Sequence, residues 1–478
     1  MISELKKTLL GRITIIPWKA LIIFAVFGAI LILYLHQSMA LNFAKASFAV
    51  ILLAALLMWI LRLVPEYIPA LILILASIFL HIAPENITLS GYSSNSFFLA
   101  TSVFAVGAII TKSRLFYRLS LILLMHLPSR QSFLQKFLFL FGALITPIMS
   151  VQSSRVALMA PLLDDILESS TINPRSDTAN ALANAAFNGC ILLSTIFLTG
   201  KSSNFLVFGL LSEQNQWQGN WLGWLWAASF PGVLLVILFF LMQSRTFKPT
   251  APLKMDRLKL KNEFKALGTL SFEEGIALLC LGFFILGSVI TTWTNISTSW
   301  TCLAIFILLF STGALNRKEL ASKINWNFLF YFGAIIGIMH ALQNTGLEGW
   351  VLGHFKWLQY LAAMNYLYFI MVVYAISWLT GLLLGTMIAP AILFTIIMPI
   401  ANQSSISNWV VAFVILVATE AWIFPYQSSY FLCFEELLKP NNNFHLNPLL
   451  KLNAWFSFLK LGIVIASIPF WYFFGLLS

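Results

Sequence analysis

Long unbroken runs of apolar residues limit this chain to very few folds. Uninterrupted apolar runs favour helices, because barrel strands alternate and every backbone polar group in hydrocarbon must be hydrogen-bonded within the protein. Of the 478 residues, 60% are hydrophobic and 9% are charged, whereas soluble proteins carry about 25% charged residues. We therefore expect an all-α polytopic membrane protein with about eleven transmembrane helices. The runs long enough to span a bilayer are 15–35, 46–64, 67–82, 97–113, 179–211, 221–243, 275–291, 298–314, 325–345, 408–432 and 453–476.

Two further apolar stretches, 136–168 and 362–402, are broken near their middle by polar or small residues. The first breaks at the sequence SVQSSR, and the second at LTGLLLGTMIAP, which contains Gly381, Gly385 and Pro390. Broken backbone at membrane depth is tolerated only where it is buried in protein or lines a water-filled cavity. Each stretch is therefore predicted to be a re-entrant hairpin, in which two helices meet at a tip and the chain returns to the side it entered from.

The basic residues are distributed asymmetrically. With the N-terminus placed inside and each hairpin counted as no crossing, nearly all Lys and Arg fall in inside loops, and only Lys45 and Lys356 fall outside. This is the positive-inside pattern of membrane proteins, so the net charge of +11 does not indicate a nucleic-acid partner. We expect a multi-pass protein of a bacterial inner (plasma) membrane with a cytoplasmic N-terminus and the lipid bilayer as its surroundings.

The order of these features repeats along the chain. In each half a hairpin is followed by a span with a polar break, TGKSSN at 199–204 and FPYQSSY at 424–430. The hairpins are predicted to enter from opposite faces, as in an inverted repeat, and such repeats place the site of secondary transporters near the bilayer midplane. We therefore divide the chain into a first repeat (1–243), a basic cytoplasmic linker (244–274) and a second repeat (275–478).

Four ionisable residues, Arg155, Lys201, Glu420 and Lys460, fall within the apolar segments. A cation at bilayer depth costs roughly 2.5–3.5 kcal/mol or more, so such a residue is a functional candidate by default. Arg155 at the first tip and Lys201 in the first break are predicted to face each other at a water-accessible site for a small anion. Guanidinium and ammonium groups both bind carboxylate, sulfate or phosphate. The neighbouring hydroxyl groups belong to Ser150, Ser153, Ser154, Ser202 and Ser203.

Glu420 has two interpretations: it is either the buried partner of Arg155 or Lys201, or a carboxylate that couples transport to protons. The sequence shows no cluster of acid and base or of metal ligands, so an enzyme, a metal site and a cofactor are not expected, and sodium or a proton is the expected coupling ion. The favoured class is a secondary anion transporter. The alternatives are an anion channel, because fixed cations in a pore also select anions, and a sodium/proton-type antiporter.

Several segments are similar to the parts of one carrier family. TPIMSVQSSRVALMAPLL resembles its first hairpin, and WLTGLLLGTMIAPAILFTIIMPIA resembles its second. The two breaks of the family are similar to GKSSNFLVFGLL and FPYQSSYFL. An early segment of the family is similar to MWILRLVPEYIPALILILASIFL, and the segment before its second hairpin is similar to INWNFLFYFGAIIGIMHALQNTGLEGW. The family is the divalent anion:sodium symporters, the di- and tricarboxylate and sulfate carriers of the ion transporter superfamily, and the likeness extends over nearly the whole chain.

This resemblance implies an elevator-type carrier, which often forms a homodimer. It also implies a dianion bound between the hairpin tips, and sodium sites formed by each tip and the neighbouring break. Gly200, Gly385 and Glu420 are then the candidates for ion coupling. The further substrate-binding candidates at the tips and breaks are Gln152, Asn204, Thr386, Gln427 and Ser428.

The chain departs from this family at the first tip and the first break. Val151-Gln152-Ser153 replaces Ser-Asn-Thr, Lys201 replaces the Thr of the break, and Arg155 lies two residues past the tip. Fixed cations would repel a nearby sodium ion by several kcal/mol at short range and intermediate dielectric. We therefore predict that they replace at least the first sodium ion in a carrier of a dicarboxylate or sulfate. Such a carrier is a uniporter, an exchanger or a proton-coupled carrier that uses Glu420.

Overall fold

The computed structural model shows a helical protein. It describes residues 28, 42–170, 172–173, 176–211, 221–247, 255–294, 297–346, 349, 353, 355–402, 406–438 and 447–477. Within these residues the chain forms helices and turns, and its β-structure is limited to an isolated bridge between Ile406 and Leu477. The predicted all-α membrane fold is therefore confirmed. The predicted first span, 15–35, lies outside the described residues apart from Gly28.

The first half contributes three helices that are long and apolar enough to cross a membrane, α3, α6 and α12. They correspond to the predicted spans 46–64, 97–113 and 221–243. The helices of this half are α3 (Phe43–Ile60), α4 (Tyr67–Phe79), α5 (Glu85–Thr88), η1 (Ser90–Ser93), α6 (Asn95–Ser113), α7 (Leu115–His126), α8 (Gln131–Ile145), α9 (Gln152–Ser169), α10 (Asp177–Ile191), η2 (Leu198–Gly200), α11 (Ser202–Leu211) and α12 (Trp221–Thr246).

The second half contributes four helices of this kind, α14, α17, α20 and α23. Helix α13 carries part of the basic linker, and its first turn is capped by the side chain of Asp256. The helices of this half are α13 (Arg257–Ala266), α14 (Phe272–Thr294), α15 (Thr298–Ser311), α16 (Arg317–Lys323), α17 (Trp326–Thr345), α19 (Lys356–Met364), α20 (Tyr366–Asn402), α21 (Asn408–Thr419), η3 (Pro425–Gln427), α22 (Ser429–Leu438) and α23 (Asn447–Phe473).

The first hairpin consists of α8, a tip at residues 146–151, and α9, and both helices pack against α10. Its limbs extend from 131 to 169, slightly beyond the predicted 136–168. Gly142 of α8 lies so close to Gly189 of α10 that a Cβ added at Gly142 would be 2.7 Å from the Gly189 carbonyl carbon. The Ala- and Asn-rich helix α10 is buried from Thr178 to Ile191, so the hairpin is anchored on a rigid core element.

The second hairpin is a single assigned helix, α20, that is bent at Gly385. A straight helix of 37 residues, at 1.5 Å per residue, would be far longer than the ~30 Å hydrocarbon core. Gly385 has φ 81° and ψ 175°, a conformation that glycine adopts without a Cβ penalty. Of the residues expected to break this stretch, Gly385 alone is non-helical, whereas Gly381 and Pro390 lie within the limbs.

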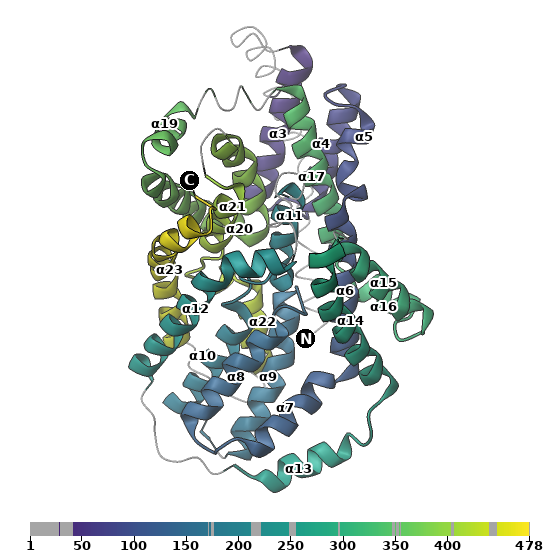
Figure 1. The fold of residues 1–478 in the computed structure, drawn as a ribbon, viewed down its shortest axis with the longest axis vertical. Helices are drawn as coiled ribbons and strands as arrows, with labels where there is room; N and C mark the ends of the chain where they lie inside the picture. Colours follow the sequence, from purple (N-terminus) through teal and green to yellow (C-terminus); the bar gives the residue numbers. More distant parts are fainter. Residues whose placement is uncertain are drawn as a thin grey trace.

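The helix of the second hairpin begins at Tyr366, slightly after the expected start near residue 362. Residues 362–364 belong to the separate helix α19, which ends because Asn365 is extended, with φ −161° and ψ 113°. Figure 1 shows α8 and α9 toward the end of the molecule that carries α13, and α20 toward the opposite end, near α19. The two hairpins thus approach the middle of the molecule from opposite ends, and the two breaks, between α10 and α11 and between α21 and α22, lie beside their tips.

Candidate functional site

Arg155 lies in the first turn of α9, directly after the first tip, and its side chain is fully buried. Its Nη1 donates hydrogen bonds to the carbonyl oxygens of Met149 (2.5 Å), Gly200 (2.5 Å) and Thr146 (3.3 Å). Its Nη2 donates to Ser194 Oγ at 2.7 Å. The guanidinium therefore occupies a cage of carbonyl and hydroxyl oxygens formed jointly by the first tip and the first break.

The first break keeps its shape through side-chain hydrogen bonds to its free carbonyl groups. Asn204 Nδ2 donates to the carbonyl oxygens of Ser194 (2.9 Å) and Phe197 (2.8 Å). Trp224 Nε1 donates to the carbonyl oxygen of Thr195 at 3.2 Å. The predicted span 179–211 is thus two helices, α10 and α11, separated by an irregular segment in which the carbonyl groups of Ser194, Thr195, Phe197 and Gly200 accept hydrogen bonds inside the protein.

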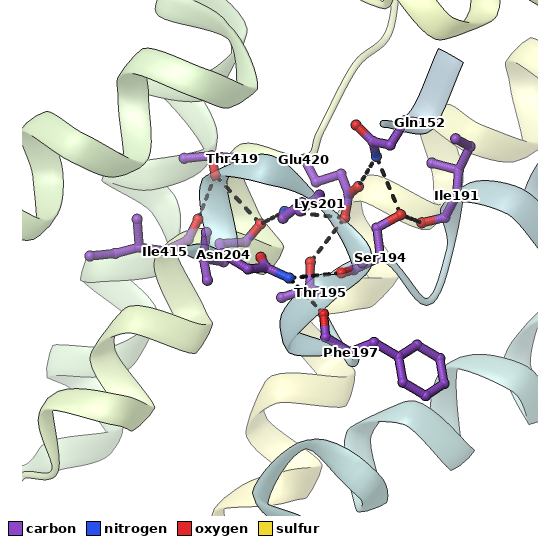
Figure 2. A network of polar contacts seen from close by, with 12 residues as sticks. Gln152, Ile191, Ser194, Thr195, Phe197, Lys201, Asn204, Ile415, Thr419 and Glu420 are labelled. Atoms are coloured by element: carbon purple, nitrogen blue, oxygen red, sulfur yellow. Dashed lines mark hydrogen bonds and ion pairs between the residues drawn. The ribbon is translucent and has the colours of Figure 1, made fainter. Parts of the chain in front are cut away.

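Glu420 connects the two halves of the chain through a buried network, shown in Figure 2. Its carboxylate accepts hydrogen bonds from Gln152 Nε2 at 2.7 Å and Thr195 Oγ1 at 3.0 Å. Lys201 Nζ lies 3.5 Å from Glu420 Oε2 and donates to the carbonyl oxygen of Leu416 at 2.9 Å. Of the two interpretations of Glu420, the geometry matches the buried ion pair, and the partner is Lys201.

Lys460 of α23 adds a third buried cation to this cluster. It interacts electrostatically with Glu420 and Lys201, although it forms no ion pair within 4 Å in the described chain. Lys201, Glu420 and Lys460 are only 2%, 4% and 7% exposed. Three cations, Arg155 included, and one carboxylate leave a formal surplus of two positive charges inside the protein.

A cavity of about 590 Å³ lies beside this cluster. Both hairpin tips, the second break, the loop between α3 and α4, and the start of α17 form its wall. The lining residues are Trp59, Arg62, Val64, Pro65, Glu66, Tyr67, Ser150, Val151, Gln152, Ser153, Ser202, Asn325, Asn327, Leu384, Gly385, Thr386, Met387, Ile388, Tyr426, Gln427, Ser429, Tyr430 and Leu432. This volume accommodates a small organic anion with water, and small-molecule pockets have volumes of about 300–1,000 Å³.

The structure brings some of the predicted site residues to the cavity and not others. Those that line it are Ser150, Gln152, Ser153, Ser202, Gly385, Thr386 and Gln427. Those that do not are Ser154, Arg155, Gly200, Lys201, Asn204, Glu420 and Ser428. The expectation that Arg155 and Lys201 face a water-accessible anion site is therefore wrong in this structure, because both side chains are buried behind Gln152 and donate to internal oxygen atoms.

Ser154 lines a second cavity, of about 340 Å³, between the first tip, α6 and the end of α16. Its wall includes Gly107, Ser322 and Lys323. Ser150 and Val151 border both cavities, so the first tip is the partition between them.

The sequence did not single out several residues that the fold places at the site. Ser194 and Thr195 bind Arg155 and Glu420, but hydroxyl groups in an apolar span carry no distinctive signal. Arg62 and Glu66 line the cavity from the α3–α4 loop. Both residues belong to the segment MWILRLVPEYIP, which resembles an early segment of the carrier family.

The family model described as the sodium:sulfate symporter transmembrane region matches residues 16–436, a range that contains both hairpins, both breaks and the whole cavity wall. The chain belongs to this family. The resemblance expected from the hairpin and break sequences is thereby confirmed, and the family is one of membrane transporters.

The curated relatives are distant. The chain is 23% identical over 270 residues to an uncharacterized transporter of Haemophilus influenzae, covering 55% of this chain and 56% of that protein. It is 22% identical over 275 residues to the inner membrane protein YbhI of Escherichia coli, covering 56% and 57%. It is 22% identical over 272 residues to the L-tartrate/succinate antiporter of Escherichia coli, covering 55% of each. The chain thus spans little more than half the length of these relatives.

Proposed function

We propose that this chain is a secondary transporter that exchanges small dianions, with the Arg155 guanidinium in the place of a sodium ion at the first hairpin tip. The observation that carries the proposal is the oxygen cage around Arg155, built from the tip carbonyls of Thr146 and Met149 and from Gly200 and Ser194 of the break. Unwound backbone carbonyls of this kind coordinate the coupling cation in secondary transporters. A guanidinium already bound there supplies the positive charge without sodium.

The charge of the buried cluster supports a dianion as substrate. Arg155, Lys201 and Lys460 with Glu420 give the buried cluster a formal surplus of two positive charges, and Gln152, which donates to Glu420, lines the cavity. A dicarboxylate or sulfate would neutralise that surplus, whereas an empty carrier would have to move the charges through a low-dielectric membrane, which is costly. The loaded form is then the mobile one, which favours exchange of one anion for another over net flux.

The name of the Escherichia coli relative, an L-tartrate/succinate antiporter, supports both the substrate class and the exchange. We propose that the two hairpins and their neighbouring breaks move as one body relative to α3–α6, in the manner of an elevator. The homodimer, the bacterial inner membrane and the cytoplasmic N-terminus expected from the sequence belong to the same proposal.

The test is uptake of labelled succinate, tartrate and sulfate into proteoliposomes that contain the purified chain. Vesicles are loaded with unlabelled anion or left empty, and sodium chloride outside is compared with choline chloride. We expect uptake that requires an internal anion and does not change with sodium. Arg155→Ser should abolish this uptake or make it sodium-dependent, and Arg155→Lys should retain part of the sodium-independent rate because it keeps the charge.

Three results would contradict the proposal. Sodium-driven uptake that Arg155→Ser leaves unchanged would make Arg155 a structural residue. Flux that does not saturate and is indifferent to the internal anion would indicate a channel. Uptake driven by a pH gradient and abolished by Glu420→Gln would give Glu420 a role in proton coupling, instead of the structural ion pair with Lys201.

A further inference from the structure

The cavity wall carries one guanidinium that the buried cluster does not account for. Among the described residues that line the 590 Å³ cavity, the charged side chains are those of Arg62 and Glu66. Arg155 and Lys201 already donate to internal carbonyl and hydroxyl oxygens or pair with Glu420. Their positive charge attracts an anion in this cavity through the intervening protein. The cation that lines the cavity and can contact the anion directly is Arg62.

The backbone around Arg62 is fixed, while its side chain is exposed. Arg62 follows α3 in the left-handed region with φ 52°, and its N–H donates to the carbonyl oxygen of Trp59 at 3.2 Å. The indole of Trp59 is 3% exposed and donates to the carbonyl oxygen of Glu66 at 2.9 Å, which closes the loop. Arg62 is exposed and forms no ion pair within 4 Å in the described part of the chain.

The hairpin tips supply neutral donors to the same cavity. Ser150 and Ser153 belong to the first tip and Thr386 to the second. Arg62 lines this cavity from the α3–α4 loop, in a part of the chain that does not belong to either hairpin. A guanidinium binds a carboxylate or sulfate through two parallel N–H···O bonds, which gives both strength and orientation.

We propose that Arg62 is a substrate-binding residue that holds one anionic group of the transported dianion, while the hairpin tips hold the other. The nearby Glu66, which interacts electrostatically with Arg62, would disfavour surplus negative charge at this position and so limit the site to a single carboxylate or sulfate oxygen pair. This inference rests on the proposed function, because it names a contact within the same substrate site.

The experiment compares Arg62→Gln with Arg114→Gln in the exchange assay. Arg114 is a close match, since it is also exposed, also has a left-handed backbone, with φ 56°, and lines neither cavity. We expect Arg62→Gln to raise the half-saturating succinate concentration about 10–100-fold, the range for losing one charge-assisted hydrogen bond. Arg114→Gln should stay within about twofold of the unmodified chain, and Arg62→Lys should lie between the two because it restores the charge without the fork.

Two readouts keep the outcome interpretable. Thermal unfolding of Arg62→Gln with and without succinate separates folding from binding: an unchanged melting temperature without succinate, and a smaller rise when succinate is added, are expected. Equal half-saturating concentrations for Arg62→Gln and Arg114→Gln, with exchange intact in the unmodified chain, would overturn this inference and leave the proposed function standing. No exchange of succinate, tartrate or sulfate by the unmodified chain would overturn both.

Discussion

The two hairpin tips differ in what fills the space between tip and break. At the first tip, a buried guanidinium, Arg155, binds the tip carbonyls and the break. At the second, the corresponding position is taken by a neutral amide: Gln427 Nε2 reaches the carbonyl oxygen of Leu382 at 3.5 Å, and its Oε1 accepts from the backbone of Phe424 at 2.9 Å. The first tip is thus closed by a fixed charge, whereas the second carries no charge of its own.

The packing of the two hairpins is otherwise alike. In the first, Gly142 of α8 lies against Gly189 of α10, and in the second, Gly381 of α20 lies against Thr419 of α21. In each half, close backbone contact fixes a hairpin limb on the helix that precedes the break. The difference between the two tips is therefore electrostatic: the first tip holds the buried Arg155 guanidinium, whereas the second presents a neutral, cavity-facing surface at Gly385 and Thr386.

The largest effect is expected from removing the fixed charge at the first tip. Arg155→Ser leaves the carbonyl oxygens of Met149 and Gly200 buried without donors. Each such loss costs about 1–3 kcal/mol, so we expect the free energy of unfolding to fall by about 3–5 kcal/mol in total. Thermal unfolding in detergent measures this. Sodium chloride in place of choline chloride should raise the melting temperature of Arg155→Ser and leave the unmodified chain unchanged, and equal responses would contradict the sodium-replacement hypothesis.

The buried ion pair gives the second prediction. Lys201→Met leaves the Glu420 carboxylate inside the protein without its cation, which costs about 3–5 kcal/mol. The double variant with Glu420→Gln should recover a large part of that loss. The control is Lys259→Met at the exposed pair with Glu168, 2.9 Å apart, where less than about 1 kcal/mol is expected. Strictly additive effects of the two buried substitutions in thermal unfolding would show that they do not interact.

The third prediction concerns the close packing of the second hairpin. A Cβ at Gly381 would be 2.7 Å from the Cα of Thr419, so Gly381→Ala must push α20 away from α21. Overpacking of this kind costs about 1–3 kcal/mol. At Gly385 a Cβ meets open space, so only the backbone conformation, φ 81° and ψ 175°, opposes a side chain, at a cost of about 1–3 kcal/mol. We expect the melting temperature to fall for both variants, and an unchanged melting temperature for Gly381→Ala would argue against tight contact at Thr419.

The smallest effect is expected at the end of α9 farthest from the tip. Tyr117 Oη donates to Asp165 Oδ2 at 3.0 Å and contacts Glu263 of α13 at 3.3 Å. Burial raises the pKa of Asp165 to about 6, above the ordinary value near 3.9. The folded protein therefore holds a proton that the unfolded chain releases, and stability falls as pH rises from about 4 to 6.

Asp165→Asn should flatten this pH dependence and stabilise the protein at neutral pH by roughly 1 kcal/mol, a value reduced for partial exposure of the carboxylate. Melting temperatures recorded between pH 4 and pH 7 measure the effect. Glu85→Gln, at an exposed carboxylate in the first turn of α5, serves as the control. An unchanged pH profile for Asp165→Asn would show that Asp165 does not cause it.

Much of the architecture followed from the sequence because membrane helices obey a local rule. Apolar length set the spans, and the polar interruptions at 150–155 and 199–204 marked the first tip and the first break. The second hairpin was predicted less accurately: three candidate residues, Gly381, Gly385 and Pro390, could each break a helix. Only the tertiary packing distinguishes them, since Gly381 is needed for contact with α21 and Gly385 for the left-handed bend.

The sequence by itself predicted that Arg155, Lys201 and Glu420 lie in apolar segments, with Glu420 either as the buried partner of one of the two cations or as a proton-coupling carboxylate. It could not determine which way they point. In the tertiary structure the Arg155 side chain donates to the carbonyls of its own tip, and Lys201 pairs with Glu420. Arg62, from the α3–α4 loop, lies on the cavity wall. The physical reason is that the free-energy cost of burying a charged side chain depends on the residue type, so the residue and its sequence neighbours are enough to reveal it. The oxygen atoms that offset that cost come from segments far apart in the chain and meet only in the folded protein.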